Sequence, residues 1–339
     1  MEVRKVQITG GATFMVTLPK GWAERVGLQP GSPLLIVPRK EALILVPEDR
    51  ARPAKVLLKL RNQSEEALAR EFISLYIAGF DIIEVRGERI SPEQRRVIRE
   101  VSRALIGPEI VEESAETMII HNLLDLSEVS AERTFERISL ISRSMFTDAL
   151  RALLDRDSDL ARDVVGRDSE VDRLFLMLSR QLRIALQDIL GEEEARLRLL
   201  DYHTATKQVE RIADHAVKIA QAASALEQSI PEGLREAIAR ASREVVARLD
   251  GATEALRQLD LDRANGVVDK AAETEKLLLK MGELLWQLEL DEAQRPRAAQ
   301  TLGIVIDSIS RVSDYTTNIA EVALNAAMPA LRGGSPPQI

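Results

Sequence analysis

The stretch that decides the fold is VERIADHAVKIAQAA at residues 209–223, which returns in altered form as ISRVSDYTTNIAEVA at residues 309–323. A second pair of segments repeats in the same way, with VVGRDSEVDRLFLML at 164–178 and VVDKAAETEKLLLKM at 267–281. Aliphatic residues recur at intervals of three and four through this region, which is the pattern of amphipathic helices. The two copies lie roughly a hundred residues apart and predict a duplicated helical bundle.

Each copy is predicted to contain three helices. We expect the first repeat to occupy residues 127–226 and the second residues 231–328, followed by a flexible tail at 329–339. The expected helices cover 127–155, 157–189 and 193–226 in the first repeat, and 231–258, 260–289 and 292–328 in the second. This body of the protein is therefore predicted to be all-α, with two similar bundles side by side.

Two smaller segments precede the helices. Residues 1–50 contain four short strand patterns separated by glycine and proline turns, which predicts a small β domain. Its few core side chains would make it marginally stable alone, so we expect it to pair with another copy of itself. Residues 52–124 alternate strand and helix patterns, with helices expected to begin at Ser64 and Ser91, which predicts a small α/β domain. This domain carries no glycine-rich phosphate-binding loop, and its ligand stays open.

Composition narrows the class of protein. The chain has 339 residues, of which 45% are hydrophobic and 29% charged, and it has no cysteine. The absence of cysteine excludes disulfides, thiolate zinc sites, iron–sulfur clusters and cysteine nucleophiles, and it fits a cytoplasmic protein. The apolar runs are too short to cross a membrane, and the opening MEVRKVQITG lacks the apolar core of a secretory signal. We therefore expect no membrane insertion.

Charge is distributed unevenly. The net charge is −8, yet residues 1–50 carry seven Lys and Arg against five Asp and Glu, so this segment is +2 and the remainder is −10. Such a division fits nucleic-acid contacts in the N-terminal segment and cation contacts in the body, and it fits ordinary solvated surfaces equally well.

Four carboxylates are spaced to share one side of two neighbouring helices. Residues four apart on a helix lie on the same face, so Asp168 pairs with Asp172 and Glu210 with Asp214. Antiparallel helices could bring the two pairs around hard or borderline cations. His203 lies seven residues before Glu210 and is a weaker candidate ligand. A solvated acidic face balanced by nearby arginines is the alternative.

The motif VERIADHAVKIA resembles the signature of the PhoU family, an E-R-I-G-D-H-A-x-N-I-A pattern with an acidic-x-x-x-Asp motif twice in each three-helix repeat. SRVSDYTTNIAE resembles it more loosely, and the resemblance covers residues 127–328. It implies a six-helix fold of two repeats and regulation of phosphate uptake alongside the Pst transporter. It also implies multinuclear binding of divalent or trivalent ions, with iron, manganese, magnesium, calcium and zinc as candidates.

The second repeat departs from the family pattern. Its aligned positions are Ala271, Glu275, Ser310 and Asp314, so two of the four carboxylates are lost. Glu275 and Asp314, with Asp307 one heptad earlier, are the weaker candidates there, and Glu273 could also compensate. We therefore expect a metal site in the first repeat rather than in the second.

The N-terminal segment has its own resemblance. GGATFMVTLPKGWAERVGLQPGSPLLIV at 10–37 resembles the SpoVT/AbrB swapped-hairpin DNA-binding domain, with an L-P-K-x-W element and a G-x-x-P-G-x turn. The resemblance implies an intertwined homodimer, or a higher oligomer of this chain, that contacts DNA through basic residues on its early strands and turns. The candidates here are Arg4, Lys5, Lys20, Arg25, Arg39 and Lys40. A segment that serves only for dimerisation is the alternative. Joined to a PhoU-like body, it resembles the archaeal phosphate-uptake regulators.

Three functions are consistent with these observations. The first is a phosphate-responsive transcriptional regulator that binds DNA through residues 1–50 and metal through its helices. The second is an interaction protein that docks on the ATPase of the phosphate transporter and restrains it, with the N-terminal segment only dimerising. The third is a metal-dependent phosphatase, which the sequence favours least because it has no GxSxG, HExxH or P-loop motif. We therefore expect that the protein is not an enzyme.

Overall fold

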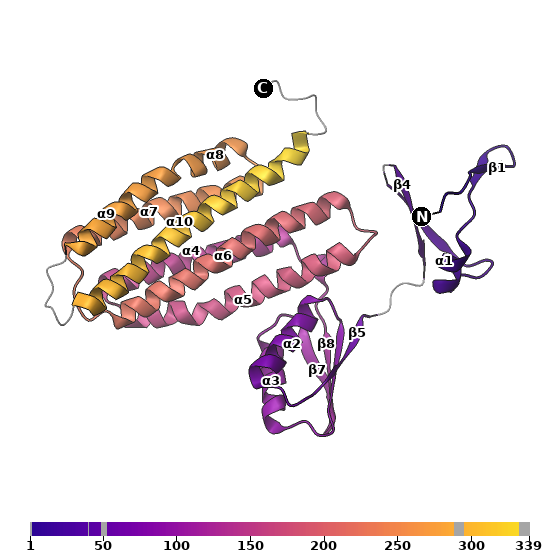
Figure 1. The fold of residues 1–339 in the computed structure, drawn as a ribbon, viewed down its shortest axis with the longest axis horizontal. Coiled ribbons are helices and arrows are strands. Elements are labelled where there is room, and N and C mark those ends of the chain that lie inside the picture. The colour runs from indigo at the N-terminus through magenta and orange to yellow at the C-terminus, as the bar shows by residue number, and fades with distance from the viewer. Residues whose placement is uncertain (1, 40, 49–52, 288–294, 332–339) are drawn as a thin grey trace. The chain divides into compact units, whose positions relative to one another are not determined.

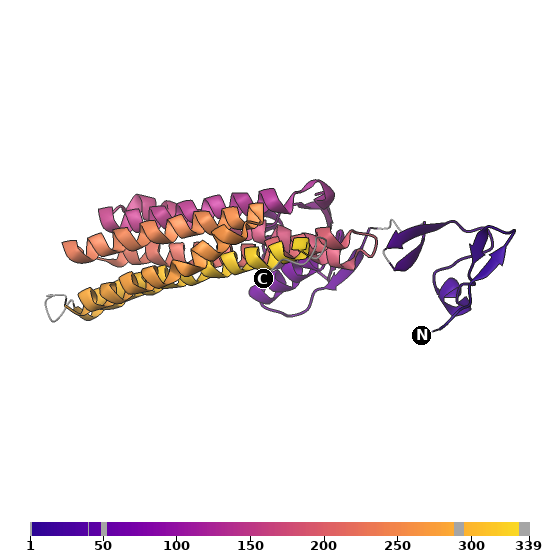
Figure 2. The ribbon, with the colours of Figure 1, turned by 90° about the horizontal axis from the view of Figure 1, so that it is seen from above.

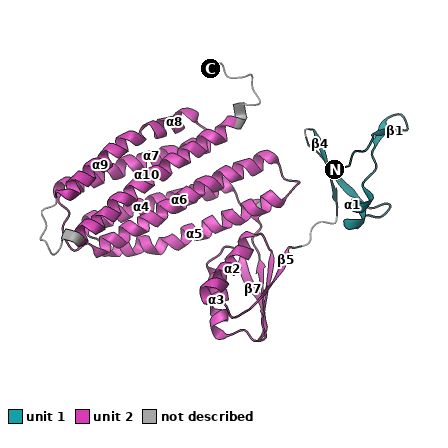
Figure 3. Ribbon diagram, viewed as in Figure 1, with its two compact units in different colours: residues 1–53 teal, residues 54–339 magenta. Residues whose placement is uncertain are grey.

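A computed structural model describes residues 2–39, 41–48, 53–287 and 295–331 of the chain. The chain divides into two compact units, Met1–Pro53 and Ala54–Ile339 (Figures 1 and 3). The first unit holds short strands and one helix, and the second holds a small sheet and the long helices, so the class predicted from the sequence is confirmed.

The first unit consists of two antiparallel hairpins with one short helix between them. Its elements are β1 (Gln7–Thr9), β2 (Thr13–Met15), α1 (Lys20–Arg25), β3 (Leu34–Arg39) and β4 (Ala42–Pro47). β1 pairs with β2 and β3 with β4. Gly10 and Gly11 have φ angles of 62° and 81°, which glycine adopts without the steric cost of a Cβ, and they form the first turn.

The first unit exposes most of its large apolar side chains. Among the residues described in this unit, Val46 is the one hydrophobic residue that is buried, with 2% of its surface exposed. Phe14 on β2 is 74% exposed, Ile8 on β1 is 64% exposed and Ile36 on β3 is 58% exposed. A folded unit with so much exposed apolar surface has not buried a core of its own, and such surfaces normally meet a partner. This agrees with the marginal stability expected from the sequence.

The second unit begins with a four-stranded sheet in the order β5-β6-β8-β7. Its elements are β5 (Lys55–Lys59), α2 (Glu65–Ile77), β6 (Ile82–Arg86), α3 (Pro92–Arg103), β7 (Pro108–Glu113) and β8 (Thr117–Asn122). β5 and β6 run parallel, as expected for strands joined by a helix, and the other pairs are antiparallel. α2 and α3 cover one face of the sheet (Figure 1).

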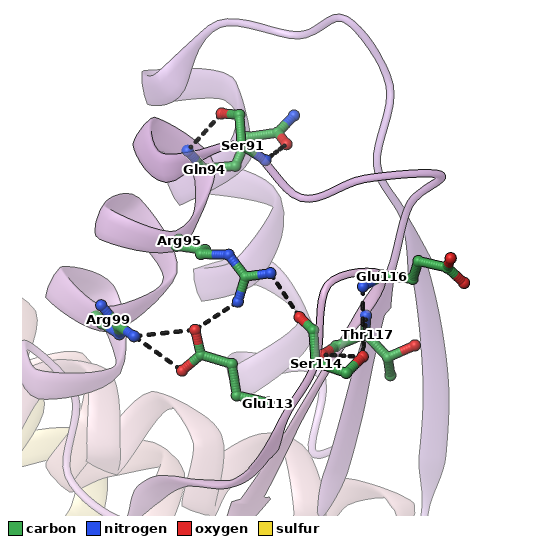
Figure 4. A network of polar contacts seen from close by, with 8 residues as sticks. All are labelled: Ser91, Gln94, Arg95, Arg99, Glu113, Ser114, Glu116 and Thr117. Carbon is green, nitrogen blue, oxygen red and sulfur yellow. Dashed lines mark hydrogen bonds and ion pairs between the residues drawn. The ribbon is translucent and has the colours of Figure 1, made fainter.

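The two helices of this segment begin at the serines that the sequence marks. The Ser64 hydroxyl accepts a hydrogen bond from the backbone N–H of Ala67 at 3.2 Å. Ser91 and Gln94 form a reciprocal capping box at the start of α3 (Figure 4). Each cap satisfies backbone N–H groups that have no partner inside the helix, which fixes where the helix starts.

The helical body contains the two repeats. A 3₁₀ turn at Leu126–Glu128 leads into it. The first repeat has α4 (Ala131–Asp155), α5 (Ser158–Gln187) and α6 (Glu193–Ala225); the second has α7 (Glu232–Gln258), α8 (Leu261–Asp269), α9 (Ala271–Trp286) and α10 (Arg295–Leu331). Arg156 and Leu259 end the first helix of each repeat in the left-handed conformation, with φ angles of 57° and 56°. This matching turn confirms the duplication and aligns Arg156 with Leu259.

The second helix differs between the repeats. α5 is continuous, whereas the single helix expected at 260–289 is divided at Lys270 into α8 and α9. The Arg248 side chain donates from Nε to the backbone carbonyl of Val267 at 3.1 Å, so this carbonyl has a partner outside its own helix. At the C-terminus, α10 extends to Leu331, and residues 332–339 of the expected tail lie outside the described residues.

The two repeats share one hydrophobic core, and their helices run alongside one another in both views (Figures 1 and 2). Arg143 of α4 pairs with Asp250 of α7 at 2.6 Å, and Asn318 of α10 donates to Gln208 of α6 at 3.2 Å. Within the described parts of the chain, no helix has both the length and the apolar character needed to cross a membrane.

Arg180 of α5 joins the helical body to the α/β segment. Its guanidinium, only 1% exposed, donates to the backbone carbonyls of Tyr76 and Phe80 at 2.7 and 2.8 Å and to Asp81 Oδ1 at 3.0 Å. Gly79, with a φ of 97°, lets the end of α2 approach α5, because a Cβ there would lie 2.9 Å from Ile184 Cγ1. One charged side chain therefore satisfies the carbonyls at the end of α2.

Candidate metal centre

α5 and α6 place the four predicted carboxylates in one neighbourhood. Asp168 and Asp172 lie one helical turn apart on α5, and Glu210 and Asp214 one turn apart on α6, which packs against α5. Asp168 and Glu210 are partly buried, whereas Asp172 and Asp214 are exposed. The structure thus brings together the two pairs that sequence spacing predicts.

The carboxylates interact electrostatically. Although the residue as a whole is exposed, partial desolvation of its carboxyl group, followed by the charges of Asp168, Glu210 and Asp214, raises the pKa of Asp172 to about 6. Burial and the charge of Glu210 also raise the pKa of Asp168 and that of Asp214. A group of like charges on a partly desolvated surface disfavours its ionised form until a cation or a proton joins it. Such a group is therefore prepared to bind positive charge.

One cation is already present in the group, and sequence reasoning missed it. The Lys207 ammonium donates to Glu210 Oε1 and Oε2 at 2.8 and 2.9 Å and lies 4.7 Å from the centre of the Phe175 ring. Its charge opposes the rise in the pKa of Asp172 and in that of Asp214. The i, i+3 spacing of Lys207 and Glu210 was the signal that could have found it.

The weaker candidate of this repeat has other contacts. His203 places Nε2 3.0 Å from the Ser179 hydroxyl and stacks on Phe175 with ring centres 5.5 Å apart. Burial and the charge of Lys207 lower its pKa. Among the residues that the structure describes, no three acidic or histidine side chains converge as a ready-made metal site. The four carboxylates supply oxygen donors that suit hard cations, but they do not form a closed cage.

The weaker candidate carboxylates of the second repeat either lie near an arginine or are exposed on the helix surface. Asp307 and Asp314 of α10 lie 3.9 and 3.8 Å from the same residue, Arg311. Glu275 is exposed on α9. Ala271 also replaces one carboxylate of the motif in this repeat. Asp307, Asp314 and Glu275 therefore fit the alternative stated above for the acidic residues, a solvated face balanced by arginine.

A buried guanidinium lies in the second repeat next to its acidic motif. Arg248 of α7 is 3% exposed and donates to the hydroxyls of Ser313 and Thr317 at 2.6 Å each and to that of Thr274 at 3.3 Å. Burial lowers its pKa and the charge of Asp314 opposes this. A fixed positive charge in this place disfavours a second cation.

Sequence reasoning also missed Arg248, although the apolar stripe of α7 held the signal. Val245, Arg248, Ala252 and Ala255 follow one another at spacings of three and four, so the arginine occupies a core position. In the first repeat the residue aligned with it, through the left-handed turns that end α4 and α7, is the fully buried Met145.

The repeats, their matching turns and their acidic helix pairs define a class of duplicated all-α protein, here preceded by a sheet segment and a β-hairpin unit. A family model described as "PhoU domain" matches residues 135–223 and 238–323, one match in each repeat. Together they cover just over half of the chain, which belongs to this family. Residues 7–53 match a second model, "Antidote-toxin recognition MazE, bacterial antitoxin", in agreement with the AbrB-like segment expected there.

Curated relatives carry one name, "Phosphate-specific transport system accessory protein PhoU homolog". The relative from Caulobacter vibrioides is 28% identical over 205 residues, which cover 58% of this chain and 86% of that protein. The relative from Pseudomonas aeruginosa is 30% identical over 186 residues, which cover 52% of this chain and 74% of that protein. The family model that bears the same name matches the helical body.

Solved structures show the same fold. A crystal structure of PhoU from Pseudomonas aeruginosa has a TM-score of 0.55 at 20% identity and covers 60% of this chain and 96% of that chain. The phosphate transport system regulatory protein PhoU from Streptococcus pneumoniae has a TM-score of 0.50 at 18% identity and covers 58% and 92%. At these identities the likeness establishes the fold of the body.

Proposed function

We propose that this chain is a phosphate-responsive regulator of phosphate uptake, acting with a phosphate transport system and not as an enzyme. The observation that carries the proposal is the pair of PhoU domain matches, one on each three-helix repeat. The named relatives are accessory proteins of a phosphate-specific transport system, which supports the same role. The MazE-like match adds a module that the sequence relates to DNA binding, so we infer that the output is transcriptional.

We further propose that the first repeat binds a divalent or trivalent metal ion through Asp168, Asp172, Glu210 and Asp214. Iron, manganese, magnesium, calcium and zinc remain the candidates, because each accepts carboxylate oxygens. A bound ion would supply the positive charge that these acids lack and would join α5 to α6. To reach Glu210 it must displace the Lys207 ammonium, which lies 2.8 Å from Oε1.

The two repeats provide a matched pair of variants for the metal proposal. Asp214→Asn should remove most of the metal that elemental analysis detects after loading and desalting, whereas Asp314→Asn should remove little. Lys207→Met should increase metal retention, because it removes the competing cation. Equal losses from the two Asp→Asn variants, or no metal in the loaded wild type, would overturn the proposal.

For the N-terminal unit we propose DNA binding by a pair of copies, with phosphate contacts from the basic candidates. Arg4 lies 2.6 Å from Glu2, and Lys20 lies 3.7 Å from Glu24. Lys5 and Arg25 are exposed and make no ion pair within the described residues, so their charges are available to DNA phosphates. Arg39 ends β3, and Lys40 lies outside the described residues.

Salt-dependent DNA binding tests this part. Full-length protein is titrated into labelled DNA from upstream of its own gene, and anisotropy is followed from low to moderate salt. Replacing Lys5 and Arg25 by Ala should weaken binding and lower the salt slope by about 1 per lost phosphate contact. The same replacement of the exposed Lys276 and Lys280 on α9 should leave both unchanged.

A second candidate function rests on the relatives' names, which describe transport accessory proteins. In it, the chain docks on the ATPase of a phosphate transporter and restrains it, while the N-terminal unit only dimerises. Absence of salt-dependent DNA binding by the wild type, together with co-purification of the transporter ATPase, would favour this alternative over the transcriptional one.

A further inference from the structure

A cavity of about 540 Å³ lies where the α/β segment meets α5. Its wall is formed by the end of α3, the turn into β7 and one residue of α5. The charged residues of the wall are Arg99, Arg103, Glu109, Glu113 and Arg173. The volume falls within the ~300–1,000 Å³ that is typical of small-molecule sites. The wall belongs largely to residues outside both PhoU domain matches.

Two arginines of the wall have no partner among the residues that the structure describes. Neither Arg103 of α3 nor Arg173 of α5 makes a hydrogen bond or ion pair with any residue that the structure describes. They come from different segments of the chain and line the same cavity. The three arginines of the wall outnumber its two carboxylates, Glu109 and Glu113, so the wall carries a net positive charge that favours an anionic ligand.

The third arginine is held in place by a network on the neighbouring strand. Glu113 of β7 accepts from Arg99 at 2.9 Å through both of its oxygens and also from Arg95, which in turn donates to the backbone carbonyl of Ser114 (Figure 4). Glu113 is thereby balanced by two arginines. This network fixes the Arg99 guanidinium at the cavity wall without cancelling the charge of Arg103 and Arg173.

Ser102 provides a second and independent indication of a ligand. It lines the cavity, is only 5% exposed, and its hydroxyl has no hydrogen-bond partner in the described structure. Buried hydroxyls are normally paired, because leaving one unpaired costs about 1–3 kcal/mol. The hydroxyl lies beneath the surface of the cavity, so a ligand oxygen would supply the missing partner only after the Ser102 side chain rotates.

We propose that this cavity binds a small phosphate monoester that also carries hydroxyl groups, such as a nucleotide or a sugar phosphate. Guanidinium groups present forked N–H donors that match phosphate oxygens, which suits Arg103 and Arg173. Glu109 lines the same wall and makes no ion pair within the described residues, so its carboxylate can accept from a ligand hydroxyl. The proposal stands independently of the function proposed above.

The position of the cavity gives the ligand a route to the helical body. Arg173 is the neighbour of Asp172 on α5, and the same helix carries Arg180, whose guanidinium holds the end of α2. A ligand bound between Arg103 and Arg173 would therefore bridge the α/β segment and the helix that bears the acidic group.

The test uses full-length protein and calorimetric titration at low salt with AMP, ribose 5-phosphate, inorganic phosphate and adenosine. AMP and ribose 5-phosphate should bind, and adenosine should not. Arg103→Gln and Arg173→Gln should each weaken binding by at least ~10-fold, the loss of a charge-assisted contact. The matched controls are Arg89→Gln, in the α/β segment away from the cavity, and Arg162→Gln, on α5. Both should leave the affinity within about twofold.

Two further variants distinguish the sources of the anion. Glu109→Gln should weaken the binding of AMP more than the binding of inorganic phosphate, because only AMP carries the ribose hydroxyls that Glu109 would accept from. Ser102→Ala should weaken the binding of AMP. It should leave the melting temperature of the ligand-free protein unchanged or raise it, because it removes an unpaired hydroxyl. Equal affinity for AMP and inorganic phosphate, with no effect of Glu109→Gln, would show that the cavity recognises phosphate alone. This result would overturn the proposal that it binds a phosphate monoester through its hydroxyl groups. If neither AMP nor inorganic phosphate binds, or if the control variants lose as much affinity as Arg103→Gln and Arg173→Gln, the proposed site is wrong.

Discussion

Arg248 and Met145 occupy the same place in the two repeats and have opposite chemistry. Met145 is fully buried in the apolar core that the two repeats share, whereas Arg248 lies among hydroxyls and one backbone carbonyl. The aligned residues change together, since Val171 faces the core of the first repeat where Thr274 bonds the guanidinium in the second. Arg248 and its hydroxyl partners thus add a buried positive charge to a repeat that has also lost two carboxylates, at Ala271 and Ser310.

The first prediction concerns this buried network. Arg248→Met leaves the hydroxyls of Thr274, Ser313 and Thr317 and the carbonyl of Val267 without their donor, so we expect a loss of about 2–4 kcal/mol of unfolding free energy. Adding Thr274→Val, Ser313→Ala and Thr317→Val copies the first repeat and should restore stability to within about 1 kcal/mol. Chemical denaturation measures both. A combined variant no more stable than Arg248→Met would contradict this account.

The second prediction concerns pH and metal-free protein. The pKa of Asp172 lies at about 6 in the folded state against an ordinary value of 3.8, so the folded state holds more protons between these values. The contribution of Asp172 to the unfolding free energy should therefore fall as pH rises from about 4 to 6. Above that range its contribution should be constant. His215, whose burial lowers its pKa to about 4, acts in the opposite direction.

Comparison with Asp172→Asn separates the two groups, because this variant keeps His215. Measured in the presence of a chelator, the stability difference between wild type and variant should change across the acid range and become constant near neutral pH. A difference that is independent of pH would show that Asp172 does not titrate in the crowded group described here.

At the scale of the elements, local signals fix helix starts and tertiary contacts fix helix interruptions. Ser64 and Ser91 start α2 and α3 as the sequence predicts, because a cap requires only residues within one turn. The division at Lys270 was not predicted, since the Val267 carbonyl finds its donor in Arg248, nineteen residues away on another helix. The end of α2 likewise depends on Arg180, which lies about a hundred residues further along.

The third prediction concerns the joint between α5 and the α/β segment. Arg180→Met removes the donor for the carbonyls of Tyr76 and Phe80 and the partner of Asp81, so the end of α2 should exchange its amide hydrogens faster. We expect a stability loss of about 3 kcal/mol or more, the usual result of breaking a buried charged network. Arg183→Met, an exposed arginine of the same helix, is the control. Equal exchange in both variants would show that other contacts hold the joint.

At the scale of the whole molecule, the sequence could predict the class, the duplication and the four carboxylates, because each depends on periodic spacing. It could not predict Lys207 as their partner or the arginine-lined cavity. The cavity is assembled from Arg103 of α3 and Arg173 of α5, and no local pattern relates residues so far apart. The unpartnered apolar face of the first unit, in contrast, was expected from its small number of core side chains.

The last prediction concerns assembly. Phe14 of β2 is 74% exposed in one chain, so Phe14→Asp costs little unless a second copy covers this face. If two N-terminal units share a core, the introduced carboxylate would be buried without a partner, and the full-length protein should shift towards monomer in light scattering at micromolar concentration. Leu140→Asp on α4, where the leucine is 67% exposed, is the matched control. A monomeric wild type would show that the chain does not assemble at this concentration, and a shift caused by Leu140→Asp alone would place the assembly surface on α4 instead of the hairpins.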